Sequence, residues 1–245
     1  MKRELEPYQR VERSIQKKFR KSIWVPFIAA VKRYELIQEN DKIAVCISGG
    51  KDSMLMAKLL QMLQRHSEVP FELVYLVMDP GYNAVNRQKI ESNAQFLHIP
   101  ITVFETNIFD VANNTDKSPC YLCAKMRRGA LNDLAKECGC NKVALGHHRD
   151  DALETLLLCL LHEGRIHTFH PKSYLSKADL TVIRPMVYLP EKHIIHVARE
   201  MQLPIIPSPC PANGATEREE MKYLLDSLCK LYPNAREMML SALQN

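Results

Sequence analysis

The sequence lacks the features that membrane, secreted and disordered proteins need. No apolar run among its 245 residues approaches the length of a membrane-spanning helix. The first ten residues, MKRELEPYQR, lack the apolar core of a signal peptide. Hydrophobic residues make up 46% and charged residues 25% of the chain, a composition that also excludes a disordered protein. We therefore expect a globular, cytoplasmic protein that does not contact membranes.

Glycine is absent from residues 8–38, and Pro26 is the one proline in that stretch. Apolar residues recur there at every fourth position, which predicts an amphipathic helix that Pro26 kinks or divides. The apolar stripe consists of Val11, Ile15, Phe19, Ile23, Phe27 and Val31. Residues 1–35 hold ten Lys or Arg against four Glu, although the whole chain has a net charge of only +5. This segment suits either a phosphate-rich partner or a solvated helix face, and charge alone does not decide between them.

Strands and helices alternate from residue 42 onward. Apolar strands are predicted at 42–47, 71–78, 101–106 and 142–145, with helices at 52–64, 85–97, 122–136 and 150–162. A further strand is predicted at 181–184 and further helices at 191–201 and 216–231. This order predicts an α/β fold with a doubly wound, mainly parallel, Rossmann-like sheet. We divide the chain into a basic helical extension at 1–39, the α/β domain at 40–210 and a C-terminal helical segment at 211–245.

A glycine pair follows the first predicted strand, in the run SGGKDS at residues 48–53. Glycine lets backbone amides approach a ligand closely, and the helix that begins there favours an anion at its first turn. Kinase-type P-loops have a different spacing and Gly-Lys-Ser/Thr order, so this is another kind of phosphate loop. The run resembles the SGGxDS pyrophosphate loop of the ATP pyrophosphatase superfamily. This resemblance implies Lys51, Asp52 and Asp150 as catalytic residues and an ATP site formed by Ser48, Gly49, Gly50, Lys51, Asp52, Ser53, Asp79, Gly146 and His147.

A second polar run, GHHRDD at residues 146–151, follows the fourth predicted strand and opens a helix. One of its two aspartates could cap that helix, whereas adjacent carboxylates near phosphates could instead hold Mg²⁺. We predict Asp52 and Asp150 as the magnesium ligands. Asp79 ends the second strand at the same edge of the sheet, where it is either a ribose or phosphate-metal contact or a plain turn residue.

Three of the eight cysteines have a spacing typical of metal ligands: Cys120 and Cys123 in a CxxC, and Cys210 between two prolines. Three thiolates suit an iron–sulfur cluster with one iron that lacks a protein ligand. A structural zinc site needs a fourth ligand, for which His147, His148 and His170 are candidates. Spacing alone leaves cluster and zinc open. Cys46 and Cys159 lie within apolar elements and are expected to be buried and inert.

Several motifs together resemble one known family. SGGKDS, CYLC followed by AKMRRGAL, GHHRDDALETLLL, RPMVYLPEK and IIPSPC occur in this order from about Lys42 to Arg218. They are similar to the tRNA 2-thiocytidine synthetases of the ATP pyrophosphatase, or PP-loop, superfamily. The resemblance implies a sulfurtransferase with ATP, Mg²⁺ and a [4Fe–4S] cluster on Cys120, Cys123 and Cys210.

The resemblance also implies a reaction and its partners. The C2 oxygen of a pyrimidine, expected to be a cytidine in the tRNA anticodon loop, is adenylated and then replaced by sulfur, releasing AMP and pyrophosphate. Besides tRNA we expect a sulfur donor, either sulfide or a persulfide from a cysteine desulfurase, and we allow for a homodimer. The expected RNA-binding residues are Arg10, Arg13, Lys17, Lys18, Arg20, Lys21, Arg127 and Arg128, although the last two could instead lie beside ATP.

Three other functions are consistent with parts of the sequence. A lysidine-type tRNA ligase would use the phosphate loop without a cluster. A sulfur-transfer enzyme for small pyrimidines would work without RNA. A non-catalytic, metal-dependent RNA-binding protein would hold nucleotide only as a regulator.

Overall fold

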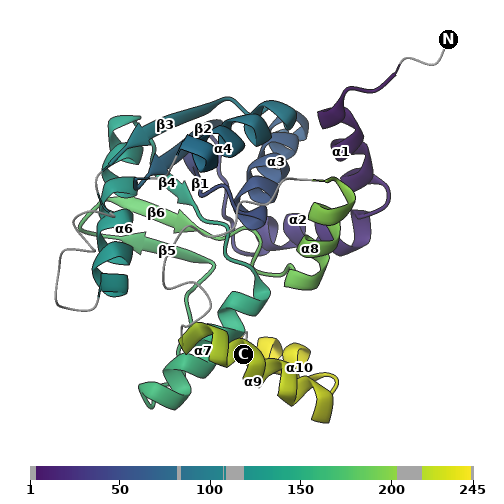
Figure 1. Ribbon diagram of the computed structural model, residues 1–245, viewed down its shortest axis with the longest axis vertical. Helices are drawn as coiled ribbons and strands as arrows, with labels where there is room; N and C mark the ends of the chain where they lie inside the picture. The colour runs from purple at the N-terminus through teal and green to yellow at the C-terminus, as the bar shows by residue number, and fades with distance from the viewer. Residues whose placement is uncertain (1–3, 82–83, 107, 109–118, 203–216, 244–245) are drawn as a thin grey trace.

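The computed structural model describes residues 4–81, 84–106, 108, 119–202 and 217–243. It contains a six-stranded sheet in the order β3-β2-β1-β4-β6-β5 (Figure 1). The strands are β1 (Lys42–Ile47), β2 (Glu72–Asp79), β3 (Ile101–Glu105), β4 (Lys142–Ala144), β5 (Lys172–Leu175) and β6 (Leu180–Ile183). All neighbours pair in parallel except β5 and β6, which form an antiparallel hairpin. The predicted α/β class and mainly parallel sheet are confirmed.

Helices cover both faces of this sheet because the central strand is apolar on both sides. The helices of the α/β core are α3 (Lys51–His66), α4 (Ala84–Phe96), α6 (Pro119–Glu137) and α8 (Glu191–Glu200). Ile43, Val45 and Ile47 of β1 pack into the large core with α3, α4 and α8. Ala44 and Cys46, which alternate with them, pack into a smaller core with α6.

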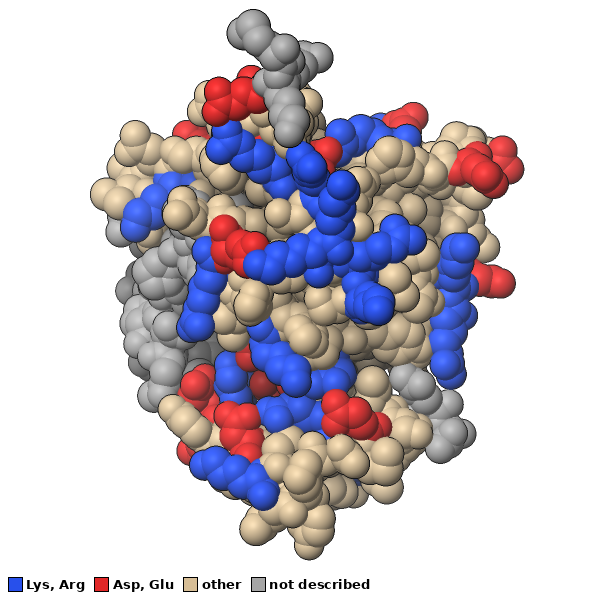
Figure 2. Space-filling model, turned by 90° about the vertical axis from the view of Figure 1, so that its right-hand side faces the viewer, with Lys and Arg blue, Asp and Glu red and all other residues tan. Residues whose placement is uncertain are grey.

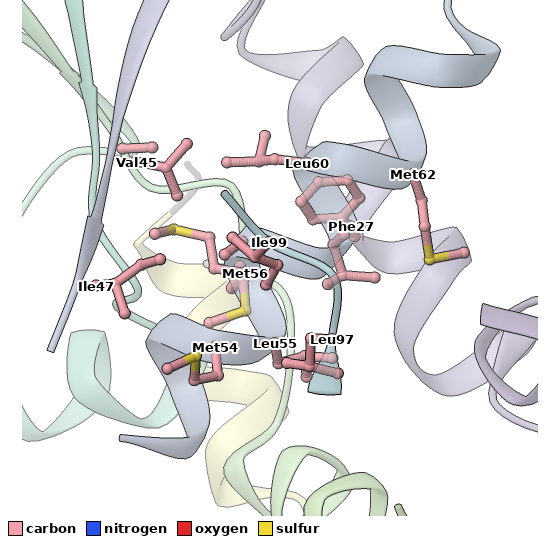
Figure 3. Close-up of a cluster of buried hydrophobic side chains, with 14 of the residues drawn as sticks. Phe27, Val45, Ile47, Met54, Leu55, Met56, Leu60, Met62, Leu97 and Ile99 are labelled. Carbon is pink, nitrogen blue, oxygen red and sulfur yellow. The ribbon is translucent and has the colours of Figure 1, made fainter. Parts of the chain in front are cut away.

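The N-terminal segment is part of the large core. It forms α1 (Pro7–Gln16), the π-helical turn η1 (Arg20–Trp24) and α2 (Val25–Arg33). All six residues of the predicted apolar stripe are buried, and Phe27 lies among Leu60 and Met62 of α3 (Figure 3). The α-helix breaks at Lys17–Phe19, well before Pro26. Pro26 lies instead in the first turn of α2, where its missing amide costs no hydrogen bond.

The C-terminal helices form a separate lobe with α7 (Arg149–His162). Helices α9 (Glu217–Leu231) and α10 (Ala235–Ala242) pack against α7 on one side of the sheet (Figure 1). Leu153 and Leu157 of α7 share a small core with Met221 and Leu225 of α9. Neither α10 nor β5 is predicted by the sequence pattern, because both are short and only partly buried.

The strand order places a crevice at the carboxyl ends of β1 and β4. The chain runs outward from β1 to β3 on one side and from β4 to β6 on the other, so the loops after these two adjacent strands diverge. Ligands bind at such a divergence in open parallel sheets. Within the described residues, no helix combines the length and the apolar character needed to span a bilayer.

Candidate functional site

The turn between β1 and α3 is shaped by the hydroxyl group of Ser53. This hydroxyl donates to the Gly50 carbonyl oxygen at 3.0 Å and accepts a hydrogen bond from the Ser48 amide at 3.1 Å. Gly49 has a φ of +82°, a left-handed conformation that strains other residues. Gly50 caps α3 without a side-chain hydrogen bond, which leaves the first-turn amides to an anion. The predicted phosphate loop thus has the geometry of an anion site.

Gly146 brings the loop after β4 against this turn. A Cβ atom on Gly146 would lie 3.2 Å from the Ser53 backbone nitrogen and 3.3 Å from the Asp52 carbonyl carbon. Backbone atoms cannot rotate away as a side chain would. Gly146 therefore allows the loop after β4 to lie against the first turn of α3, and its predicted contact with ATP stays a prediction.

A cleft of about 710 Å³ lies beside the phosphate loop. Its polar lining consists of Ser48, Asp52, Ser53, Arg127, Arg128, Gly146, His147, Asp151, Thr155, Arg184 and Arg218. Arg127 and Arg128 come from α6, the helix that begins at Pro119 and includes Cys120 and Cys123. Both arginines thus line the same cleft as the phosphate loop, and whether they bind ATP or RNA stays a prediction.

Two cleft residues carry buried nitrogen atoms that lack a partner among the described residues. One is Nε of Arg184, and the other is Nδ1 of His147. Burial lowers the pKa of Arg184 to about 10 and that of His147 to about 4, so at neutral pH the arginine is charged and the histidine is not. Phe169 contacts both, with its ring centroid 4.9 Å from the guanidinium and 5.0 Å from the imidazole. An anion in the cleft would supply the acceptor that Arg184 lacks, so the cleft fits a nucleotide phosphate.

Asp151 links the cleft to the start of α7. Its carboxylate accepts from the His148 amide at 2.8 Å, and its own amide donates to His148 Nδ1 at 3.3 Å, which forms a capping box. Its other oxygen accepts from Arg218 at 3.3 Å. Glu154 follows Asp151 by three residues on α7, and its burial and the charge of Asp151 raise its pKa to about 7.

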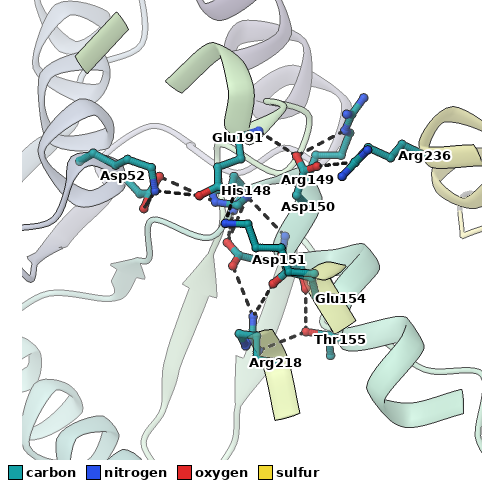
Figure 4. A network of polar contacts seen from close by, with 12 residues as sticks. Asp52, His148, Arg149, Asp150, Asp151, Glu154, Thr155, Glu191, Arg218 and Arg236 are labelled. Atoms are coloured by element: carbon teal, nitrogen blue, oxygen red, sulfur yellow. Dashed lines mark hydrogen bonds and ion pairs between the residues drawn. The ribbon is translucent and has the colours of Figure 1, made fainter. Parts of the chain in front are cut away.

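Asp150 points away from the residues that line the cleft. One carboxylate oxygen accepts from the Glu191 amide at 2.8 Å and the other from Arg236 Nε at 2.9 Å (Figure 4). It therefore ties α7 to the first turn of α8 and to α10. Among the described residues, no three His, Cys, Asp or Glu side chains gather closely enough to hold a metal ion. Magnesium binding by Asp52 and Asp150 stays a prediction, and the carboxylate that shares the cleft with Asp52 is that of Asp151.

Lys51 is held by two carboxylates. Its Nζ atom lies 3.0 Å from Asp52 and 3.0 Å from Glu191, and Glu191 also pairs with Lys222 of α9 at 2.8 Å (Figure 4). Burial alone would raise the pKa of Glu191, but the two lysines lower it to about 2. Lys51 has a raised pKa for the same reason, since Asp52 and Glu191 outweigh its desolvation. This chain of charges joins the phosphate loop to the C-terminal lobe.

Asp79 lies at the carboxyl end of β2, as expected, and is buried. One of its carboxylate oxygens accepts from the Gly81 amide at 2.9 Å. That contact belongs to the turn that follows the strand. A nucleotide contact by Asp79 stays a prediction.

The described residues do not test the metal role of the cysteines. Cys120 and Cys123 lie in the first turn of α6, but their side chains and the whole of Cys210 lie outside the described part of the chain. Helix α9 begins seven residues after Cys210 and brings Arg218 to the cleft. Cys46 and Cys159 are buried, as predicted, and burial raises the pKa of Cys46 to about 12.

The predicted RNA-binding residues of the N-terminal segment are all exposed. Lys and Arg side chains cross the face in Figure 2, the side that α1, α2 and α8 form in Figure 1. Arg10 pairs with Glu4 and Lys18 pairs with Glu200. The other four, Arg13, Lys17, Arg20 and Lys21, are exposed and form no ion pair within the described residues.

Sequence reasoning missed several residues of this site. Arg184, Phe169 and Arg218 line the cleft, and Glu191 holds Lys51. Arg184 and Glu191 both lie within the RPMVYLPEK motif, and Arg184 directly follows β6, so a charged residue after a buried strand was the available signal. Nothing in the local pattern marks Phe169, because it lies in a segment without regular structure.

Comparisons with protein families, sequence relatives and solved structures agree with the fold and the phosphate loop described above. Residues 8–220 match the model of the PP-loop domain. The tRNA-cytidine(32) 2-sulfurtransferase of Citrifermentans bemidjiense is 38% identical over 88% of this chain and 87% of the relative, and that of Geobacter sulfurreducens is 39% identical over 88% and 86%. Among solved structures, the U34-tRNA thiolase NcsA from Methanococcus maripaludis, with its [4Fe-4S] cluster, matches 89% of this chain and 78% of its own chain. The TM-score is 0.69 and the sequence identity is 24%, which shows a shared fold. The chain therefore belongs to the PP-loop family and, within it, to the tRNA-cytidine(32) 2-sulfurtransferases.

Proposed function

We propose that this protein is a sulfurtransferase that uses ATP to replace the C2 oxygen of a cytidine in the tRNA anticodon loop, at position 32, with sulfur. One observation carries the proposal: helix α6 contains two of the predicted cluster cysteines and also lines the cleft beside the phosphate loop. Its first turn holds Cys120 and Cys123, and Arg127 and Arg128 further along it line the cleft beside the phosphate loop. The proposed sulfur chemistry and nucleotide chemistry therefore share one element of the fold.

The ATP half rests on complementary charge. The amides of the phosphate loop and the first turn of α3 receive the pyrophosphate, and Lys51 provides a positive charge next to them. Arg127, Arg128 and Arg184 line the same cleft. Preorganised donors of this kind stabilise the charge that develops when pyrophosphate leaves. Asp52 would hold the Mg²⁺ ion that accompanies ATP, because one of its buried oxygens lacks a hydrogen-bond partner among the described residues.

The reaction has two steps. The C2 oxygen of the cytidine attacks the α-phosphorus of ATP, the bond from that phosphorus to the bridging oxygen of pyrophosphate breaks, and an adenylated base forms. A sulfur nucleophile then adds at C2 and AMP leaves with the former C2 oxygen. The protein's part is to orient the base against the α-phosphorus and to exclude water, which would return the adenylated base to cytidine.

The sulfur half uses Cys120, Cys123 and Cys210 as ligands of a [4Fe–4S] cluster. These three thiolates would hold the cluster, which would supply an iron position for binding sulfur. The first turn of α6 places two of these cysteines at the start of a helix that lines the cleft. Sulfide would deliver the sulfur atom directly, whereas a persulfide from a cysteine desulfurase would also need a thiol to reduce the S–S bond after its outer sulfur has added at C2. The chain would meet tRNA in the cytoplasm. A homodimer stays a prediction.

The exposed cations of the N-terminal segment would hold the phosphate backbone of tRNA. Arg13, Lys17, Arg20 and Lys21 are exposed on the segment that contains α1 and η1. Such contacts are independent of base sequence and weaken with salt. The target base must leave its stack to reach the cleft, which costs least in a single-stranded loop.

The proposal is tested by nucleoside mass spectrometry of tRNA from cells that lack this protein. We expect 2-thiocytidine to disappear and to return when the wild-type chain is supplied. A Cys123→Ser chain should fail to restore it, whereas Cys138→Ser, at a half-buried cysteine outside the predicted cluster set, should succeed. An unchanged content of thiolated cytidine in the deletion strain would refute the function.

A further inference from the structure

A second cavity of about 270 Å³ adjoins the nucleotide cleft. It lies between the segment that follows α7, the loop between β6 and α8, the end of α2 and the end of α10. Its walls include Phe169, Tyr34 and Tyr188, and Ala242 of α10 lies at its edge. We call this cavity the aromatic pocket.

Phe169 belongs to both cavities. On the cleft side its ring contacts His147 and the guanidinium of Arg184, at 5.0 and 4.9 Å. Phe169 therefore separates the two cavities at the place where they meet. The pocket is a continuation of the site in which the target cytidine meets ATP.

The pocket combines aromatic rings with polar groups. The hydroxyl groups of Tyr34 and Tyr188 form a 2.9 Å hydrogen bond, and their ring centroids lie 5.7 Å apart. Imidazoles of His167 and His170 stand at the exposed rim. Planar faces with a polar edge suit a nucleobase, because every base offers a face for stacking and an edge for hydrogen bonds.

Three cations lie near the pocket, and one of them, Arg165, is paired with Glu163. The guanidinium of Arg33 lies 6.0 Å from the centre of the Tyr34 ring, and Lys172 Nζ donates to the Glu35 carbonyl oxygen at the same end of α2. Arg165 is exposed, one residue before the pocket segment. The flanking charge favours a ligand that carries phosphates on either side of its base, which is a nucleotide within an RNA strand.

We propose that the aromatic pocket binds an unpaired nucleobase of the tRNA loop next to the base that is modified. This inference rests on the proposed function and adds a second RNA subsite to it. When the target cytidine leaves the loop for the cleft, its neighbour loses a stacking partner. Phe169 and the two tyrosines replace that partner, so the pocket lowers the cost of extracting the target base.

The test uses a residue that narrows the pocket without touching the cleft. Ala242 is exposed near the end of α10, so an Ala242→Trp change fills the pocket from a position that tolerates a larger side chain. Met238→Trp is the matched control, since Met238 is 63% exposed on the same helix and does not line the pocket. We expect Ala242→Trp to weaken binding of an anticodon stem-loop RNA about ten-fold. Binding of a fluorescent ATP analogue should not change, and Met238→Trp should bind RNA as the wild type does.

A scan of the stem-loop with single abasic nucleotides identifies the base. At one loop position the abasic RNA should bind the wild type about ten-fold more weakly, and Ala242→Trp should add no further loss there. Equal RNA affinity of the Ala242→Trp and Met238→Trp chains would overturn the pocket. The proposal would also be overturned if, at every loop position, the loss of affinity from the abasic nucleotide multiplied with the loss from Ala242→Trp. Failure of the wild-type chain to bind any stem-loop would instead refute tRNA as the substrate.

Discussion

At the scale of single residues, the helical geometry at the start of α7 points two adjacent carboxylates in different directions. Asp150 and Asp151 are adjacent carboxylates at the start of α7, but successive residues of a helix point about 100° apart. Asp151 therefore lines the cleft, whereas Asp150 accepts hydrogen bonds from Glu191 and Arg236. The sequence predicts that an acidic pair stands at this helix start, but which carboxylate faces the ligand depends on where the helix begins.

Lys51 is the residue whose loss should affect the ATP half most. A Lys51→Ala change removes a cation beside the phosphate loop, and we expect ATP-dependent pyrophosphate release to fall about 10²-fold or more. The measurement is a pyrophosphate assay with purified chain and tRNA. Lys89→Ala, at an exposed position on α4, is the control and should keep full activity. Wild-type turnover by Lys51→Ala would remove the lysine from the mechanism.

Glu154 should make the stability of the fold depend on pH. Its pKa is raised from 4.5 to about 7 by burial and by Asp151, so the neutral form favours the folded state. That contribution is complete below about pH 4.5 and is lost as the pH rises through 7. We expect the wild type to lose about 1–3 kcal/mol more unfolding free energy between pH 5 and pH 8 than Glu154→Gln, measured with urea. Equal losses in the two chains would contradict the raised pKa.

At the scale of elements, the sequence predicts best where burial is regular. β1, α3 and β2 lie within a few residues of their predicted bounds, because strand and helix periods are clear in the buried core. The position of the break in the N-terminal helix is not predicted by the sequence pattern. Pro26 is the evident breaker, yet the chain leaves the α-helix at Lys17–Phe19 and passes through a π-helical turn that keeps Phe19 and Ile23 in the core. Tertiary packing, which no local pattern contains, decides that position.

The contact between the loop after β4 and α3 gives an element-scale test. A Gly146→Ala change places a methyl group 3.2 Å from a backbone nitrogen, and we expect it to lower the unfolding free energy by about 1–3 kcal/mol. Gly129→Ala, in the middle of α6, is the counterpart, since outside its own helix turn no atom of the described residues lies within 4 Å of its Cβ position. This change should raise the unfolding free energy by about 0.5–1 kcal/mol. Denaturant titrations of both variants measure whether the unfolding free energy changes in opposite directions. Equal changes in the two variants would refute the close contact at Gly146.

At the scale of the whole molecule, the basic N-terminal segment is not a removable arm. Ile15, Ile23 and Phe27 are fully buried, and Glu12 of α1 pairs with the buried Lys58 of α3 at 2.5 Å. The predicted boundary at residue 39 therefore marks no break in the hydrophobic core. Deleting the segment would unfold the protein, so its role in RNA binding has to be tested by surface substitutions.

The double variant Lys17→Ala/Lys21→Ala removes two exposed cations and leaves the core intact. We expect weaker tRNA binding and a salt dependence whose slope falls by roughly 0.7–0.9 for each phosphate that the variant no longer neutralises. Filter binding at several salt concentrations measures both quantities. Lys89→Ala/Lys177→Ala changes the net charge by the same amount at other exposed positions and should have a smaller effect. Equal slopes for the two double variants would show that net charge alone attracts the RNA.

The pairing of Lys222 with Glu191 has a practical consequence for anyone who shortens this protein. A chain that stops at Cys210 would retain every predicted cluster cysteine and the entire phosphate loop. It would nevertheless lose Arg218, Lys222 and Arg236, which neutralise Asp151, Glu191 and Asp150. Asp151 would then stand without a cation in the cleft proposed for ATP, Glu191 would keep only Lys51, and Asp150 would lose its partner on α10. Possession of all the catalytic motifs would not make such a fragment competent.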